Sequence, residues 1–188
     1  MSGRIVMEVD KKRWRVSLLP GQIVLVSTSD REGIPNVAPK SWISMVSFSP
    51  PILGFGCNLK HQTARNVLEV KQFVVNIPDK SLAQKVWKTG ESPHKGAASI
   101  KKLGFSLVSS NKISAPGIQE CKAQLECAYE SDKRFGDELW IFGRILSVSA
   151  DKTLIQGSSQ ERYSRLSPIF YLEQNTYGTL GEVKNLQP

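Results

Sequence analysis

The feature that most constrains the fold is a strict alternation of apolar and polar residues in the second half of the chain. Between residues 121 and 130 every other position is apolar; these positions are Cys121, Ala123, Leu125, Cys127 and Tyr129. A period of two is the repeat of a β-strand, and here the opposite face is polar and solvated. The pattern predicts an antiparallel β-protein with Cys121 and Cys127 on the same buried face.

Short apolar and β-branched runs between tight turns predict the other strands. These runs are residues 22–28, 36–48, 52–58, 72–77, 139–148 and 168–172. The turn at 29–33 ends in Gly33, where a positive φ is expected. The 36–48 run is expected to break at Pro39. The 139–148 run is apolar on both faces, which predicts a central strand with a bend or bulge at Gly143.

Two short helices follow from capping residues and apolar spacing. Thr63 is the expected N-cap of the first helix, and Asp79 is the expected N-cap of the second. Residues 92–103 are predicted to form a loop and a short basic helix that ends at Gly104.

Composition narrows the class of protein. A chain of 188 residues with 40% hydrophobic residues suits one domain over residues 1–188, with a core of about 18–181. No apolar run reaches the roughly 18 residues of a membrane span, and the start does not resemble a signal peptide, so we expect a cytoplasmic protein without membrane contact. Three scattered cysteines and two histidines predict neither a disulfide framework nor a metal site.

The formal net charge of +8 comes from basic residues spread along the chain. No basic helix or aromatic-basic motif accompanies it, so we expect no nucleic-acid partner. A basic surface of this kind suits the binding of small anions such as phosphorylated cofactors. Rossmann, P-loop and Gly-x-Ser-x-Gly motifs are absent from the sequence, and no catalytic side chain is assigned. If the protein is an enzyme, the chemistry is expected to belong to a bound cofactor.

Two segments have the composition of a binding site. In residues 36–42, Lys40 and Ser41 can meet an anion and Trp42 can lie against a flat ring; the alternative is a β-bulge with Trp42 in the core. Residues 58–66 bring basic and polar side chains to a helix start, which favours a phosphate; the alternative is ordinary capping by Thr63.

These segments also carry a resemblance. Residues 24–33, 36–42, 49–51, 63–66 and 73–78, followed by 125–127, 136–137, 142–145, 168–170 and 177–181, occur in the order seen in the flavin reductase-like family. The ordered set resembles that family over residues 18–181. The resemblance implies a mainly β fold with short helices, a six-stranded antiparallel Greek-key split β-barrel known as the FMN-binding split barrel.

The resemblance also implies a homodimer with FMN near the subunit interface. The residues that it assigns to FMN are Ala38, Pro39, Lys40, Ser41, Trp42, Asn58, Lys60, His61, Thr63, Lys95 and Tyr177. The implied function is an FMN-dependent oxidoreductase that takes hydride from NADH or NADPH. Its electrons would pass to free flavin, a ferric complex or a redox partner protein. The alternative is a flavoredoxin-like FMN electron carrier, or an FMN-binding protein, without its own NAD(P)H activity.

Overall fold

A computed structural model describes residues 19–91 and 94–184. The elements in chain order are β1 (Gly21–Gln22), β2 (Val24–Ser29), β3 (Pro35–Lys40), β4 (Ile43–Phe48), β5 (Pro51–Asn58), α1 (Gln62–Val70), β6 (Gln72–Ile77), the 3₁₀ turn η1 (Lys80–Leu82), α2 (Ala83–Glu91), β7 (His94–Lys95), α3 (Ala97–Lys102), β8 (Leu107–Val108), β9 (Gly117–Ile118), β10 (Ala123–Phe135), β11 (Glu138–Ala150), the 3₁₀ turn η2 (Lys152–Leu154), α4 (Ser159–Leu166), β12 (Ile169–Glu173) and β13 (Thr176–Thr179).

The main sheet is antiparallel, with the strand order β4-β5-β11-β10-β6-β2-β3-β7. Its eight strands in the described residues exceed the six that were expected. Five strands separate β3 from β4 in this order, yet only Ser41 and Trp42 connect the two strands along the chain. The sheet therefore curls until its two sides meet.

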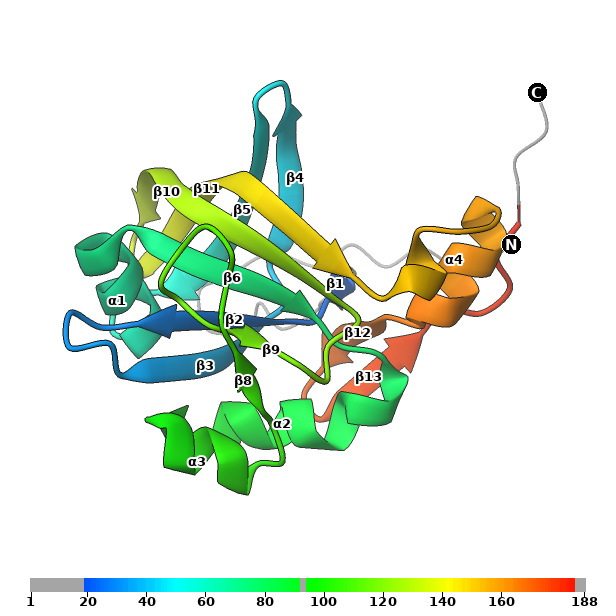
Figure 1. Cartoon of the computed structure of the whole chain (residues 1–188), viewed down its shortest axis with the longest axis horizontal. Coiled ribbons are helices and arrows are strands. Elements are labelled where there is room, and N and C mark those ends of the chain that lie inside the picture. The colour runs from blue at the N-terminus through cyan, green and yellow to red at the C-terminus, as the bar shows by residue number, and fades with distance from the viewer. Residues whose placement is uncertain (1–18, 92–93, 185–188) are drawn as a thin grey trace, which may run out of the picture.

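Small elements surround the curled sheet (Figure 1). A three-stranded sheet, β1-β12-β13, joins the start of β2, and α2 and α3 lie together on one side of the molecule. The β4–β5 hairpin projects away from the rest of the fold. No helix of the described residues has the length and apolar character needed to span a membrane.

Apolar residues form two cores, one on each face of β2. Val24 and Val26 belong to the inner core, which also holds Phe55, Phe73 and Ile141. Leu25 points the other way into an outer core, whose other large members are Val86, Ile100, Phe105, Ile118 and Ile169. Because successive side chains of a strand point to opposite faces, β2 contributes to both cores.

The two cysteines of the alternating segment lie in different cores, so the expectation of a shared face is wrong. Cys127 belongs to the inner core, while Cys121 belongs to the outer one. The reason is that β10 begins only at Ala123; the Cys121 amide donates to Ile118 in the preceding turn. All three cysteines are buried and free.

Several local expectations are confirmed. Gly33 has a φ of 77°, and the Asp79 side chain accepts a hydrogen bond from the Ser81 amide at the start of η1 and α2. The basic helix α3 ends at Lys102, before Gly104 with its φ of 80°. The final strand, predicted over 168–172, is β12, and the strand β13 that follows it was not predicted.

The expected break at Pro39 is wrong. β3 runs without interruption from Pro35 to Lys40, with Pro39 opposite Leu25 of β2. On the other side of β3, β7 pairs only with Asn36 and Val37 among the described residues. Proline is tolerated at such an edge because it has no amide hydrogen to contribute to a ladder.

Gly143 allows a close approach between β11 and the inner core. A Cβ atom at this position would lie 2.3 Å from Cζ of Phe73 and 3.2 Å from Cβ of Cys127. The predicted bulge is present in the partner strand, where the register of β10 shifts between Tyr129 and Ser131. The glycine is required because the Phe73 ring occupies the space of a side chain.

We therefore expect Gly143→Ala to lower the free energy of unfolding by roughly 1–3 kcal/mol, the usual cost of overpacking a core. Urea unfolding monitored by circular dichroism measures it. Phe73→Leu should recover part of this loss in the double variant, since the smaller side chain vacates the space. Gly181→Ala is the matched control, because nothing lies within 4 Å of its added Cβ. Equal stability of Gly143→Ala and the control would contradict the packing argument.

Candidate functional site

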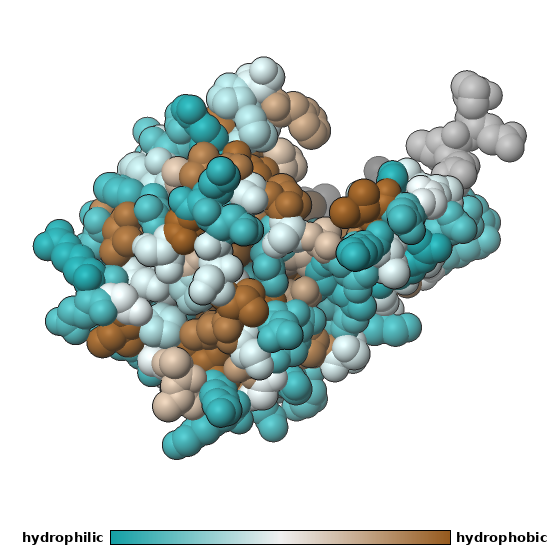
Figure 2. Space-filling model, in the orientation of Figure 1, coloured by the Kyte–Doolittle hydropathy of each residue, from teal (hydrophilic) through white to brown (hydrophobic). Residues whose placement is uncertain are grey.

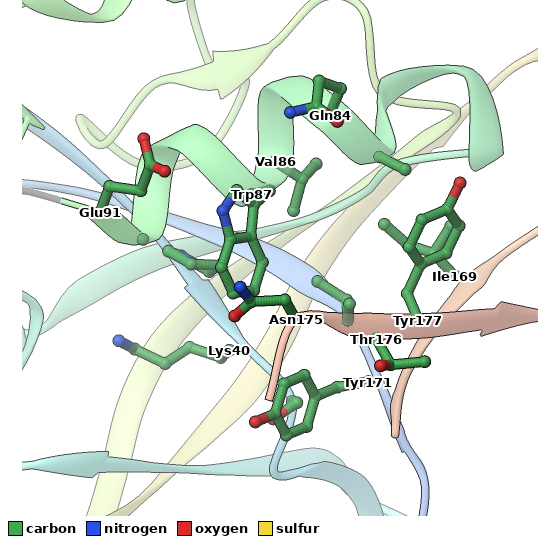
Figure 3. Close-up of a pocket in the computed structure, with 15 residues that line it drawn as sticks. Lys40, Gln84, Val86, Trp87, Glu91, Ile169, Tyr171, Asn175, Thr176 and Tyr177 are labelled. Atoms are coloured by element: carbon green, nitrogen blue, oxygen red, sulfur yellow. The ribbon is translucent and has the colours of Figure 1, made fainter. Parts of the chain in front are cut away.

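A cavity of about 490 Å³ opens between the end of β3, helix α2 and the β12–β13 hairpin (Figure 3). Trp87 of α2 and the hairpin residues Tyr171 and Tyr177 supply aromatic side chains to its wall, and Pro39 and Ser41 line it from β3 and the segment that follows. Its volume lies in the usual range for small-molecule sites, roughly 300–1,000 Å³.

The local folding of two elements places the aromatic side chains. Tyr171 and Tyr177 are register partners in the β12–β13 ladder, so both belong to one hairpin. Trp87 lies on the helix that Asp79 caps and is 39% exposed. Sequence reasoning assigned Trp87 to a helix face and gave Tyr171 no role. Both were missed because only the tertiary fold brings α2 and the β12–β13 hairpin to the same cavity.

Lys40 is the buried cation of this region. The residue is 8% exposed at the last position of β3, opposite Val24, and it lines the cavity, which its nitrogen reaches rather than being enclosed in the core. Within the described residues its ammonium group forms neither a hydrogen bond nor a salt bridge. Burial lowers the pKa of Lys40, and the Cys57 sulfur and the Glu138 carboxylate oppose this only in part.

The second candidate segment forms the turn from β5 to α1, which we call the β5–α1 turn (residues 58–63). Asn58 organises it: its side chain donates to Glu138 at 3.2 Å and accepts from the Lys60 amide at 3.0 Å. His61 is the N-cap residue of α1, and its side chain makes no capping hydrogen bond. The first-turn amides and the helix dipole give this end of α1 a partial positive charge.

The expectation that Thr63 caps the helix is wrong. The His61 amide donates to the carbonyl of Asn58, so the helix begins at Gln62 and Thr63 is its second residue. Thr63 is buried, with its hydroxyl 3.5 Å from Nδ2 of Asn36 on β3. This contact joins the two candidate segments near the start of β3.

At the other end of β3, the charge of Lys40 acts on groups of the second candidate segment and of β5. Desolvation lowers the pKa of His61, and the positive charge of Lys40 lowers it further, while Glu138 opposes the shift. Burial raises the pKa of the Cys57 thiol to about 11, although Lys40 favours its ionisation. At neutral pH the thiol is therefore protonated, so the charges at this junction are those of Lys40 and Glu138.

The remaining predicted residues lie around these two parts. Ala38 is half-buried within β3, opposite Val26. Trp42 is 55% exposed and lies over Gly56, so the alternative that placed it in the core is wrong. Lys95 of β7 forms a salt bridge with Asp30 at 3.0 Å. The cavity brings together Pro39, Lys40, Ser41 and Tyr177, while the β5–α1 turn holds Asn58, Lys60, His61 and Thr63.

Comparison with known proteins identifies the family. A family model described as a flavin reductase-like domain matches residues 16–174. The chain belongs to the flavin reductase-like family. A protein of Archaeoglobus fulgidus, whose function is uncharacterised, is 33% identical over 129 residues, which are 69% of this chain and 73% of that protein.

Three solved structures show the same fold. Nitrilotriacetate monooxygenase component B from Bacillus cereus has a TM-score of 0.85 and 24% identity, over 98% of this chain and 100% of that one. An FMN-binding protein from Thermus thermophilus, with bound p-hydroxybenzaldehyde, has a TM-score of 0.80 and 18% identity, over 99% and 100% of the two chains. A flavin reductase-like protein from Shewanella frigidimarina, described as having a split barrel domain, has the same fold with a TM-score of 0.81 and 16% identity, so the predicted fold class is confirmed apart from the number of strands.

Within this flavin reductase-like fold, the uncompensated charge of Lys40 should reduce stability. We expect Lys40→Met to raise the free energy of unfolding of the ligand-free protein by up to about 1 kcal/mol at pH 7, because a partly desolvated charge is replaced by an apolar side chain of similar length. Chemical unfolding of both proteins at matched pH measures this difference.

The pH dependence provides the control. Since the folded-state pKa of Lys40 lies below its unfolded value of about 10.4, the unfolded state binds more protons between those two values. The wild type therefore gains stability as pH rises through the folded pKa, and the advantage of Lys40→Met shrinks there. A constant or growing advantage up to pH 10 would show that the Lys40 charge is not the cause.

Proposed function

We propose that this chain is an FMN-dependent oxidoreductase of the flavin reductase type, which takes hydride from NADH or NADPH. Electrons then pass to free flavin, a ferric complex or a redox partner protein. The observation that carries the proposal is an aromatic cavity that Lys40 lines. The start of α1 is close enough for the charge of Lys40 to affect His61.

The residues present fit the two chemical ends of FMN. A flat ring system suits a cavity with Trp87, Tyr171 and Tyr177 in its wall, since aromatic side chains stack on such rings. A phosphate suits the β5–α1 turn, because Lys60 and the amides at the start of α1 supply charge and donors. The FMN-binding protein from Thermus thermophilus, which shares the fold, supports FMN as the cofactor.

In the proposed reaction the protein binds FMN, orients its ring and excludes water from it. Bound FMN supplies a ring that accepts a hydride, so no acid or base has to be provided by a side chain for that step. This agrees with the protonated Cys57 thiol and with the lowered pKa of His61, which favours its neutral form. Pro39 and Ser41 would border the ring, and Tyr177 would cover it from the β12–β13 hairpin.

We expect the purified protein, after incubation with FMN, to show flavin absorption bands and to quench FMN fluorescence on titration. FMN should bind about ten- to a hundredfold more tightly than riboflavin, since a charge-assisted contact is worth roughly 1.5–3 kcal/mol. Lys60→Met should reduce this preference; Lys85→Met is the control, because the Lys85 ammonium donates to Gly104 in another part of the fold. Equal affinities of the wild type for FMN and riboflavin would contradict the phosphate site.

Anaerobic addition of NADH or NADPH then separates the reductase from the alternative electron carrier. A reductase loses its oxidised flavin absorbance with one of these donors and regains it when ferric citrate or free flavin is added. If the bound FMN is reduced by dithionite but by neither nicotinamide, the reductase proposal is wrong and the carrier is favoured.

A homodimer is part of the proposal, and an exposed apolar face supports it. Trp42 lies over Gly56, beside Trp140, and Val46 lies over Gly54, beside Phe142. Val46 is 55% exposed, and Phe48 of the same projecting hairpin is 87% exposed. Figure 2 shows a hollow in the surface between the projecting hairpin and the region of α4. Exposed apolar patches of this kind mark interaction surfaces, and a second copy presents the same face.

We expect sedimentation to give a mass near twice 20.9 kDa for the wild type at micromolar concentration. Val46→Lys should weaken the dimer roughly a hundredfold or more, because burial of an unpaired charge in an interface is costly. Phe135→Lys is the matched control, since Phe135 is an exposed apolar residue at the β10–β11 turn, at the other end of the sheet from Val46. A monomeric wild type with FMN bound would refute the dimer.

A further inference from the structure

The excess positive charge of the described residues lies in one part of the fold. The elements η1, α2, β7 and α3 carry six lysines, and Glu91 is their single acidic residue. The other described residues hold fourteen basic and fourteen acidic side chains, so their formal charges cancel. We call this part of the surface the lysine face; its lysines are Lys80, Lys85, Lys88, Lys95, Lys101 and Lys102.

Contacts between α2 and the end of α3 hold the lysine face together. The ammonium group of Lys85 on α2 donates to the carbonyl oxygen of Gly104, just after α3, at 3.1 Å. The same nitrogen lies 5.9 Å from the centre of the Phe105 ring. Figure 1 shows α2 and α3 together on one side of the molecule. Their charges therefore add in one direction.

Most of this charge faces solvent. Five of the six lysines are exposed, and Lys85 is the half-buried exception. Among the described residues, no carboxylate forms an ion pair with Lys80, Lys101 or Lys102. An excess of unpaired surface charge on one side of a protein attracts partners of opposite charge before contact.

Helix stabilisation accounts for only part of the set. Lys101 and Lys102 lie in the last turn of α3, where the helix dipole favours a cation. Lys80 lies at the opposite kind of position, in the turn that leads into the start of α2, where the dipole disfavours a cation. Its charge therefore needs another explanation.

The lysine face borders the cavity proposed for the flavin ring. Helix α2 also supplies Gln84, Trp87 and Glu91 to the cavity wall (Figure 3). Lys88 follows Trp87 and lies one helical turn after Gln84, so it stands at the rim of the cavity. Trp87 is 39% exposed, and it contacts both the cavity and solvent. A partner on this face therefore approaches the cavity at its Trp87 side.

We propose that the lysine face is the docking surface for an acidic electron-transfer protein, which takes electrons from reduced FMN at the rim beside Trp87. This inference rests on the proposed function and names the chemistry of the redox partner. Two molecules of a one-electron carrier take up the two electrons of one reduced FMN. The ring returns to the oxidised form and releases its protons to solvent.

The composition of the face favours a protein over a nucleic acid or a membrane. Trp87 is the single aromatic residue of the four elements and lies in the cavity wall, so the face has no platform for stacked bases. The large apolar residue of α3, Ile100, is buried, so this helix has no apolar stripe to enter a bilayer. Redox partners form small, short-lived complexes in which complementary charges increase the rate of encounter.

The test is the rate at which the reduced protein passes electrons to acceptors of known charge. The FMN-loaded protein is reduced photochemically without oxygen, so the test needs no nicotinamide. It is then mixed in a stopped-flow instrument with plastocyanin, an acidic copper protein, or with cytochrome c, a basic haem protein. We expect the rate constant for plastocyanin to fall about tenfold or more between about 10 mM and about 300 mM salt, because salt screens the attraction. The rate constant for cytochrome c should not fall.

Charge reversal locates the docking surface. The double variant Lys88→Glu/Lys101→Glu should react with plastocyanin at low salt about tenfold or more slowly than the wild type. Lys133→Glu/Lys152→Glu is the matched control, since it changes the net charge equally at exposed lysines outside the face. It should slow the reaction by about threefold at most, because distant exposed charges are screened.

Two measurements show that the face variant is intact. Its thermal melting and its affinity for FMN should match those of the wild type, since neither lysine lines the cavity. If the reversed variant does not fold, Lys88→Gln/Lys101→Gln takes its place. That variant removes the charges without adding acidic groups, and it should slow the plastocyanin reaction by a smaller factor.

The outcomes separate the inference from the proposed function. The same salt dependence with both acceptors, or the same loss in both double variants, would overturn the docking surface and leave FMN binding intact. The inference also fails if the face binds a single-stranded oligonucleotide or phosphatidylserine vesicles while the protein shows no preference for the acidic acceptor. A wild type that binds no FMN refutes the proposed function itself.

Discussion

Closure of the main sheet is the constraint on which the site depends. Only Ser41 and Trp42 connect β3 to β4, and the hydrogen bond from the Gly56 amide to the Trp42 carbonyl extends the β4–β5 ladder up to this connection, so the end of β3 lies beside β5. A side chain at position 56 would meet the Trp42 ring at 2.9 Å, so glycine is needed for this approach. Without closure, the residues after β3 and the β5–α1 turn would lie on opposite sides of a flat sheet. Closure brings Lys40 close enough to His61 to lower its pKa, and close enough to Glu138 for that carboxylate to act on the pKa of Lys40.

The burial of Lys40 links stability to the proposed chemistry. Desolvation of its ammonium group is unfavourable in the ligand-free protein, and an anionic ligand would reverse this cost. Natural active sites commonly combine local instability with function in this way. The rest of the inner core, with Phe55 and Phe73 in edge-to-face contact, stabilises the barrel around this position.

Local patterns predicted the elements well where a short segment determines its own structure. The Gly33 turn and the Asp79 cap depend on backbone conformation and one side chain, and both were predicted. The prediction of Thr63 as a cap failed because the hydrogen bond from the His61 amide to Asn58 starts the helix earlier. The Pro39 prediction failed because an edge position in a sheet cannot be recognised from the neighbouring residues alone. Cys121 was misplaced because the alternation continues in the sequence before the strand itself begins.

The sequence by itself determined a mainly β protein, the family to which it is similar, and the two segments that hold most of the candidate residues. Alternation, turns and ordered motifs are local properties, so they can be recognised in the amino-acid sequence alone. Only the tertiary structure decided which of these residues share a site. Trp87 and Tyr171 joined the cavity, and Lys95 paired with Asp30, because sheet closure and the β12–β13 hairpin bring distant segments together. The exposure of Trp42 and the isolation of the Lys40 charge likewise depend on contacts across the sheet, which no local pattern records.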